Sequence, residues 1–122
     1  MPPRQLPAPP TDTPLRPSDL LVLLMLAPGD RHGYGIMQDV EAFTEGRVLL
    51  EAGSLYRTIR RLSEEGLLTE SGRRPAADKD DDRRRYYRLT PLGRRVVTAE
   101  VERMRGLVRL AEAADLVPRD GR

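Results

Sequence analysis

The first element that the hydrophobic pattern predicts is a helix that follows Ser18 and ends before Pro28. Ser18 is a good N-cap, and Asp19 lies in the first turn. The run from Leu20 to Ala27 is apolar on every side, whereas a surface helix has a polar face. One side of this helix is therefore expected to pack on its own domain, and the other side on a second subunit.

A second helix is predicted over residues 33–46, with His32 and Gly33 at its start and Gly46 as its stop. Its apolar positions recur at helical spacing: Tyr34, Met37, Val40 and Phe43.

A third helix is predicted from about Ala52 to Glu65. Leu55, Ile59 and Leu62 fall on one face, and Gly66 ends the helix as a left-handed cap.

Two strands with a polar loop between them are predicted to follow. They cover residues 67–73 and 83–89, and the loop covers residues 74–82. In the second strand, Tyr87 and Leu89 share one face. The opposite face carries Arg84, Tyr86 and Arg88.

A last helix opens at Thr90, a good N-cap, with Pro91 at the first helical position. Its apolar residues alternate steps of four and three, as in a coiled coil. They are Val97, Val101, Met104, Val108 and Ala111, and a second apolar side adds Val96, Leu107 and Leu110. This is more apolar surface than one small domain can hide. We therefore expect a dimer interface that combines the seam with three residues of the first helix, Leu21, Leu24 and Met25.

The order helix, helix, helix, strand, loop, strand, helix is that of a winged helix-turn-helix. The expected fold class is mainly α with a two-stranded β wing (α+β) and a C-terminal dimerisation helix. Seven of the 11 prolines lie in residues 1–17, which predicts a disordered tail. Residues 18–90 are then the DNA-binding domain, residues 91–117 the dimerisation helix, and residues 118–122 a second tail.

The composition mainly excludes functions: it argues against a metal site, a membrane span and catalysis. The net charge of the 122 residues is only +2, so any basic surface must be local. The absence of cysteine excludes disulfides and thiolate metal sites. The longest apolar run, residues 20–27, is too short to span a bilayer, and we expect a cytoplasmic protein with no membrane partner. His32 is the only histidine and no phosphate-binding loop occurs, so we expect no catalysis, no metal and no cofactor.

The third helix offers a candidate DNA-binding face opposite its leucine stripe. Gly53, Arg57, Arg60 and Arg61 project from that side, with Ser54 and Tyr56 on its flanks. Arginine can bind guanine edges through two hydrogen bonds, and a helix N-terminus favours phosphate. The alternative is a solvated helix face, which is what most charge runs are.

The predicted wing adds a second group of cations that can lie along phosphates. They are Arg73, Arg74, Lys79, Arg83, Arg84, Arg85 and Arg88. The acidic residues Asp78 and Asp80 to Asp82 lie in the same loop and would repel DNA.

Three segments in this order and spacing resemble the PadR family of bacterial transcription regulators. They are HGYGI (residues 32–36), GSLYRTIRRLSEEGLL (residues 53–68) and RRYYRLTPLG (residues 84–93). The resemblance implies a winged helix-turn-helix protein that represses transcription, and in this family a small molecule often relieves the repression. The single helix after Gly93 resembles the smaller subfamily, which has one C-terminal helix. It places Tyr34 near phosphate, Ser54, Tyr56 and Arg57 in the major groove, and the wing arginines on the backbone or minor groove. Glu51 and the acidic wing loop depart from the family pattern.

Together these features predict a homodimeric repressor that binds double-stranded DNA at a palindromic operator and responds to a small hydrophobic or aromatic effector. Met25 and Met104 suit such an effector pocket, although filling irregular gaps in a core is the more common role of methionine. Two other functions stay open. The third helix can dock a protein instead of DNA, or the protein can be a small-molecule sensor with only secondary DNA contact.

Overall fold

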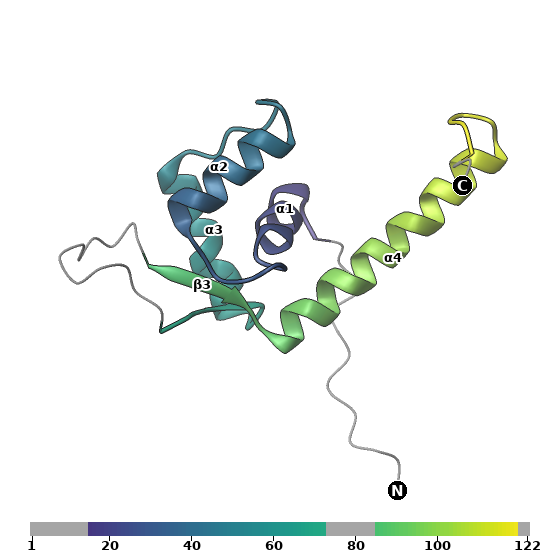
Figure 1. The fold of residues 1–122 in the computed structure, drawn as a ribbon. Helices are drawn as coiled ribbons and strands as arrows, with labels where there is room; N and C mark the ends of the chain where they lie inside the picture. The colour runs from purple at the N-terminus through teal and green to yellow at the C-terminus, as the bar shows by residue number, and fades with distance from the viewer. Residues whose placement is uncertain (1–14, 73–84, 120–122) are drawn as a thin grey trace, which may run out of the picture.

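The computed structural model describes residues 15–72 and 85–119, and their arrangement is shown in Figure 1. The elements are α1 (Pro17–Met25), β1 (Arg31–His32), α2 (Gly33–Phe43), α3 (Ala52–Glu64), β2 (Leu68–Glu70), β3 (Tyr86–Leu89) and α4 (Pro91–Ala113). The expected mainly helical α+β class is confirmed. The first 14 residues of the predicted tail, the wing cations Arg73, Arg74, Lys79, Arg83 and Arg84, and the acidic loop lie outside the described residues.

The two predicted wing strands are confirmed as the antiparallel pair β2 and β3, and the sheet has a third strand, β1, that the sequence did not predict. The strand order is β1-β3-β2, with both pairs antiparallel. Arg31 pairs with Tyr87 on one edge of β3, and Leu68 pairs with Leu89 on the other. The strand β1 has only two residues, both polar, so the sequence shows no alternating pattern there. It forms because β3 offers an edge to pair with.

Helix α1 begins one residue before the predicted N-cap. Arg16 is the N-cap and makes no side-chain cap, while Pro17 takes the first turn and Ser18 lies inside the helix. Proline favours this position because its fixed φ is helical and its missing N–H would be unpaired there anyway. Ser18 is therefore not the N-cap.

Hydrophobic burial follows the predicted stripe in α3 and only in part in α2, where Val40 is buried and Met37 packs against the core. Leu55, Ile59 and Leu62 of α3 are buried, as the spacing predicted. In α2, Ile36 and Val40 fill the core, whereas Tyr34 and Phe43, both counted as apolar positions, are 55% and 71% exposed. Two glycines end helices as predicted, because Gly46 and Gly66 have φ of 81° and 80°.

The start of α4 is locked onto the end of α3 by one side chain. The Thr90 hydroxyl donates to the Gly66 carbonyl at 2.6 Å and accepts from the Gly93 N–H at 2.9 Å. The predicted N-cap at Thr90 and the proline at position 91 are thereby confirmed. Gly93 also lies directly against the backbone carbonyl of Leu67, where a Cβ would overlap it.

Gly93→Ala is expected to destabilise the fold, because the overlapping atoms belong to backbone and cannot rotate away. Overpacking of this kind costs about 1–3 kcal/mol, and a backbone contact lies at the upper end. Gly106→Ala is the matched control in the same helix, since nothing lies within 4 Å of its added methyl group. It should be neutral or stabilising by up to about 1 kcal/mol. Urea unfolding of both variants measures the difference, and equal free energies of unfolding would contradict the packing described.

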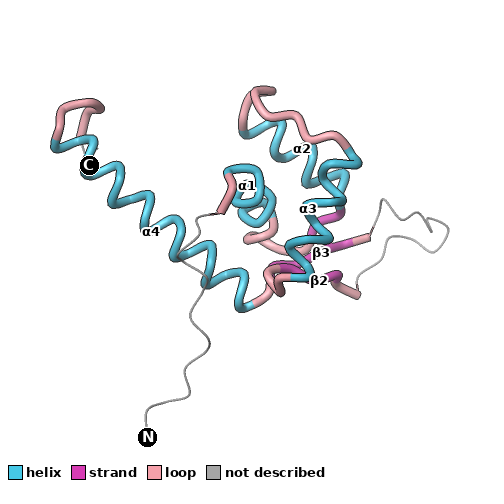
Figure 2. Tube along the Cα trace, turned by 180° about the vertical axis from the view of Figure 1, so that it is seen from behind, coloured by secondary structure: helices cyan, strands magenta, loops and turns pink. Residues whose placement is uncertain are grey.

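Helix α4 leaves the domain after its first half. Figures 1 and 2 show that its N-terminal half lies beside α1, while its C-terminal half extends beyond the other elements. Val96 and Val97 are buried in the core, whereas Met104, Leu107, Val108 and Leu110 are exposed. None of the helices in the described part of the chain is apolar over the length needed to cross a membrane.

Candidate nucleic-acid interface

The outward face of α3 carries two exposed arginines. Its buried stripe holds the helix on the core, so Arg57 and Arg60 point to solvent, together with exposed Gly53 in the first turn. Glu51 is the N-cap and makes no side-chain hydrogen bond to the helix. The first-turn N–H groups of α3 are therefore not capped by Glu51, which suits an anion at this end. A Cβ at Gly53 would meet Arg57 Nη1 at 3.6 Å, an ordinary contact, so Arg57 folds back over the first turn.

Tyr56 has a packing role that the sequence did not predict. It is half-buried, and its hydroxyl end lies so close to Gly33 that a Cβ there would overlap it. Gly35 is crowded in the same way by the guanidinium of Arg31, which makes two hydrogen bonds to Asp39 at 2.9 and 3.0 Å. The glycines of the HGYGI segment thus allow β1, α2 and α3 to approach one another.

Arg61 does not project freely from α3 as expected. Its guanidinium donates two hydrogen bonds to the carboxylate of Asp19 in α1, both at 3.0 Å. The pKa of Arg61 is raised, first by these hydrogen bonds and then by the nearby charges of Asp19 and Glu65. The helical projection placed Arg61 with the outward arginines because it ignored a partner 42 residues away in sequence.

His32 and Tyr34 form the start of α2. His32 Nδ1 accepts a hydrogen bond from the Gly35 N–H at 2.9 Å, so the predicted position of His32 at the helix start is correct and its side chain is the cap. Its ring packs edge-on against Tyr86 with centroids 5.4 Å apart. Tyr34 is exposed on the first turn, a position from which its hydroxyl is accessible to a phosphate.

His32→Ala is expected to lower the free energy of unfolding by about 1 kcal/mol, the usual cost of losing an N-cap. His32→Asn is the control, since asparagine is among the best N-cap residues and can accept the same hydrogen bond. Denaturant unfolding of both variants is the measurement. An equal loss in both variants would mean that ring packing on Tyr86, rather than capping, is the main contribution.

Arg85, directly before β3, and Arg88, within β3, are already paired with carboxylates. Arg85 Nε lies 3.7 Å from Glu70 Oε2, and Arg88 Nη2 lies 3.4 Å from Asp30 Oδ2. Both pairs are partly exposed, so each contributes little to stability and a phosphate can compete for the arginine. A groove of about 270 Å³ runs between α3 and β3 beside the first pair. Its lining includes Arg60 and Arg85, together with Glu64 and Glu70.

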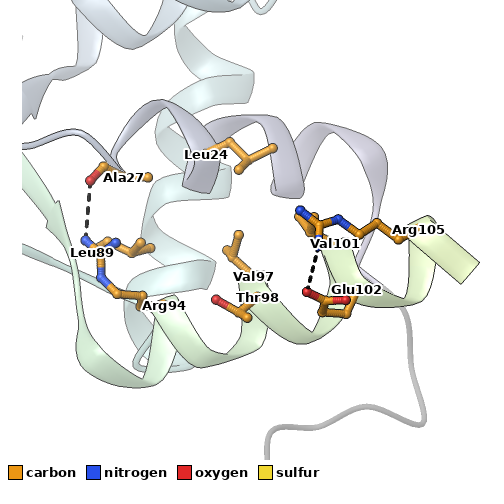
Figure 3. A pocket seen from close by; sticks show the side chains of 9 residues that line it. All are labelled: Leu24, Ala27, Leu89, Arg94, Val97, Thr98, Val101, Glu102 and Arg105. Carbon is orange, nitrogen blue, oxygen red and sulfur yellow. Dashed lines mark hydrogen bonds and ion pairs between the residues drawn. The ribbon is translucent and has the colours of Figure 1, made fainter. Parts of the chain in front are cut away.

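A second groove, of about 300 Å³, separates α1 from α4 (Figure 3). Leu24 lies on one side and Val97 and Val101 on the other. These are three of the eight residues predicted for the dimer interface. Of the others, Leu21, Met25 and Ala111 are partly buried, and Met104 and Val108 are exposed. Arg94, Glu102 and Arg105 form the polar rim of the groove.

The comparison with known families decides the identity of this fold. A family model described as the transcriptional regulator PadR-like family matches residues 22–99. The chain belongs to the PadR-like family. The expected resemblance is confirmed, and the fold is a winged helix of a family of transcriptional regulators rather than enzymes. No curated protein matches the sequence.

Solved structures of PadR-like regulators have the same fold. A transcriptional regulator from Clostridium thermocellum is 25% identical with a TM-score of 0.63, over 78% of this chain and 89% of that one. A PadR family regulator from Eggerthella lenta is 28% identical with a TM-score of 0.60, over 84% and 83%. Bacillus subtilis PadR, solved in complex with operator DNA, is 20% identical with a TM-score of 0.60. In that pair the alignment covers 70% of this chain but only 47% of the other, and it supports the fold alone.

Proposed function

We propose that this PadR-like protein is a homodimeric repressor that binds a palindromic DNA operator through α3. The observation that carries the proposal is the division of α3 into a buried stripe and an outward face with exposed Arg57 and Arg60. The stripe fixes which residues face outward, and a guanidinium matches both phosphate oxygens and guanine edges. Ser54 and Tyr56, on the flanks of this face, and Tyr34, at the start of α2, complete the proposed contact surface. The operator complex of the B. subtilis relative, which shares the fold, supports DNA as the partner.

The proposed dimer rests on the exposed apolar residues of α4. Leu107, Val108 and Leu110 are each more than half exposed in the single chain, on a helix half that extends away from the domain. A helix that exposes an apolar face in this way is stabilised by packing on another protein surface. A second copy of α4 supplies the same face, as two-fold dimers require.

Selection of duplexes from a random pool tests the proposal. The protein should enrich sites with two inverted half-sites whose centres lie about 10 bp, or one helical turn, apart. Binding should also weaken steeply with salt, since each phosphate contact contributes about 0.9 to the slope of log K against log salt. Enrichment of no sequence, together with binding that salt does not affect, would contradict the proposal.

The groove between α1 and α4 favours a second part of the proposal, regulation by a small hydrophobic or aromatic molecule. Five of the nine residues that line it are leucine, valine or alanine, and three are charged, so the groove offers a small molecule both apolar contacts and polar partners. Titration with phenolic acids or hydrophobic cations, with and without the selected duplex, tests it. A regulatory ligand must change DNA affinity by the same factor as DNA changes ligand affinity. Ligand affinity that is unchanged by DNA would exclude regulation through this groove.

A further inference from the structure

Within the described residues, the ion pair between Asp19 and Arg61 joins α3 to a buried carboxylate of α1. The Asp19 side chain is 5% exposed and the Arg61 side chain 38% exposed. A carboxylate this deeply buried is costly unless it is paired and hydrogen-bonded. The two parallel hydrogen bonds from Arg61 meet that need, and they also fix the relative orientation of the two groups.

The pair connects α3 to α1, and α1 in turn contacts α4. α3 packs against α2 and β2, and Arg61 links it to α1. On its other side α1 packs against α4, where Arg94 Nη2 donates to the Ala27 carbonyl at 3.3 Å (Figure 3). α1 therefore provides one connection between α3 and α4, in addition to the hydrogen bond from Thr90 to Gly66 at the end of α3.

We propose that Asp19 and Arg61 are positioning residues, which hold α3 at the tilt that DNA recognition needs relative to the α1–α4 face. This inference rests on the proposed function. The buried stripe fixes the rotation of α3 about its own axis, and the paired Arg61 adds a contact to α1 that fixes its tilt on that side. Arg61 lies seven residues beyond Ser54, about 10 Å along the helix. A tilt of about 10° at Arg61 therefore moves the base-contacting end by about 2 Å, enough to misplace a bidentate contact.

A different role for Arg61 makes the opposite prediction. If Arg61 released Asp19 and bound a phosphate, then Asp19→Asn would free the guanidinium and remove a repelling charge. DNA affinity would rise in that variant. If the pair positions α3, the same substitution lowers the preference for the selected duplex, because asparagine cannot accept two charge-assisted hydrogen bonds.

Four variants of the 122-residue chain distinguish three roles of the pair: positioning of α3, phosphate binding by Arg61, and stabilisation of the fold alone. Arg61→Met and Asp19→Asn each remove one charge, and the double variant removes both. Arg60→Met is the matched control, because Arg60 is the adjacent arginine of α3 and is exposed. The measurements are the melting temperature, the affinities for the selected and for a random duplex, and the slope of log K against log salt.

Arg61→Met should lower the melting temperature by about 5 °C or more, since it leaves the Asp19 carboxylate buried and unpaired. It should lower the ratio of selected to random affinity about tenfold, the loss of one specific base contact, with the salt slope unchanged. The double variant should recover most of the melting temperature but not the affinity ratio. Arg60→Met should do the reverse, with a normal melting temperature, a smaller salt slope and equal weakening on both duplexes.

A measurement that needs no DNA completes the test. The chain has no cysteine, so Ser63→Cys gives one spin-label site on the exposed side of α3. The label-to-label distance distribution in the dimer should be narrow in the parent protein and broader in both the Arg61→Met and the double variants. This result would support the positioning role even if the protein bound no duplex, an outcome that would overturn the proposed function alone.

Three results would overturn the inference. The first is tighter DNA binding by Asp19→Asn. The second is a salt slope that falls as much in Arg61→Met as in Arg60→Met. The third is recovery of the affinity ratio together with the melting temperature in the double variant, which would make the pair structural only.

Discussion

Replacing both Arg57 and Arg60 by alanine is expected to abolish recognition of the selected duplex. The two side chains are exposed on the outward face of α3, and a dimer presents each of them twice. A bidentate base contact contributes about 1–3 kcal/mol, so losing one at each half-site together with the phosphate contacts lowers affinity roughly a thousandfold. Fluorescence anisotropy with the labelled duplex measures this loss.

The control for this double substitution removes the same charge elsewhere. Arg109→Ala with Arg119→Ala affects two exposed arginines at the C-terminal end of the chain. It should weaken binding only slightly, because distant surface charges are screened at physiological salt. The melting temperature should be unchanged in both double variants. Equal loss of affinity in the two would show that net charge, rather than the face of α3, determines binding.

Val108→Asp is expected to convert the proposed dimer to a monomer. Val108 is 51% exposed in the single chain and belongs to the predicted apolar seam of α4. In a two-fold interface the substitution buries two carboxylates near each other, and each unpaired buried charge costs several kcal/mol. Sedimentation equilibrium should show a monomer at micromolar concentration. Affinity for the two-half-site duplex should fall at least a hundredfold, because the second half-site no longer binds as part of one molecule.

Arg109→Asp is the matched control for Val108→Asp. It places a carboxylate at the adjacent exposed position of α4, about 100° around the helix from Val108 and from Leu110 and about 160° from Leu107. This variant should remain a dimer with normal DNA affinity. If Val108→Asp also remains a dimer, α4 does not provide the interface.

Local signals predicted much of this fold. The spacing of Leu55, Ile59 and Leu62 identified the buried side of α3, because helical periodicity reports burial directly. Thr90 and Gly66 marked a helix start and a helix end, because capping and left-handed conformations depend on the residue itself. The alternation in β3, with Tyr87 and Leu89 buried, was confirmed for the same reason.

Features that depend on distant partners were not predictable in the same way. The strand β1 exists because β3 offers a free edge to Arg31 and His32, and two residues carry no period. The partner of Arg61 is 42 residues away, so the helical pattern of α3 showed only an arginine on a polar face. One local signal was available but ambiguous, since an aspartate at position 19 reads equally well as a favourable first-turn residue. The contacts assigned to Tyr34, Gly53, Ser54, Arg60 and the other site residues remain predictions.

A crystal structure of the protein with its selected duplex tests the central claim most directly. The quantities to measure are the distance between the two α3 helices and the direction in which each one faces. The account predicts two α3 helices about 34 Å apart on one side of the dimer, each with Arg57 toward a major groove. Helices that face away from each other, or an Arg57 side chain that packs inside the protein while DNA lies elsewhere, would contradict it.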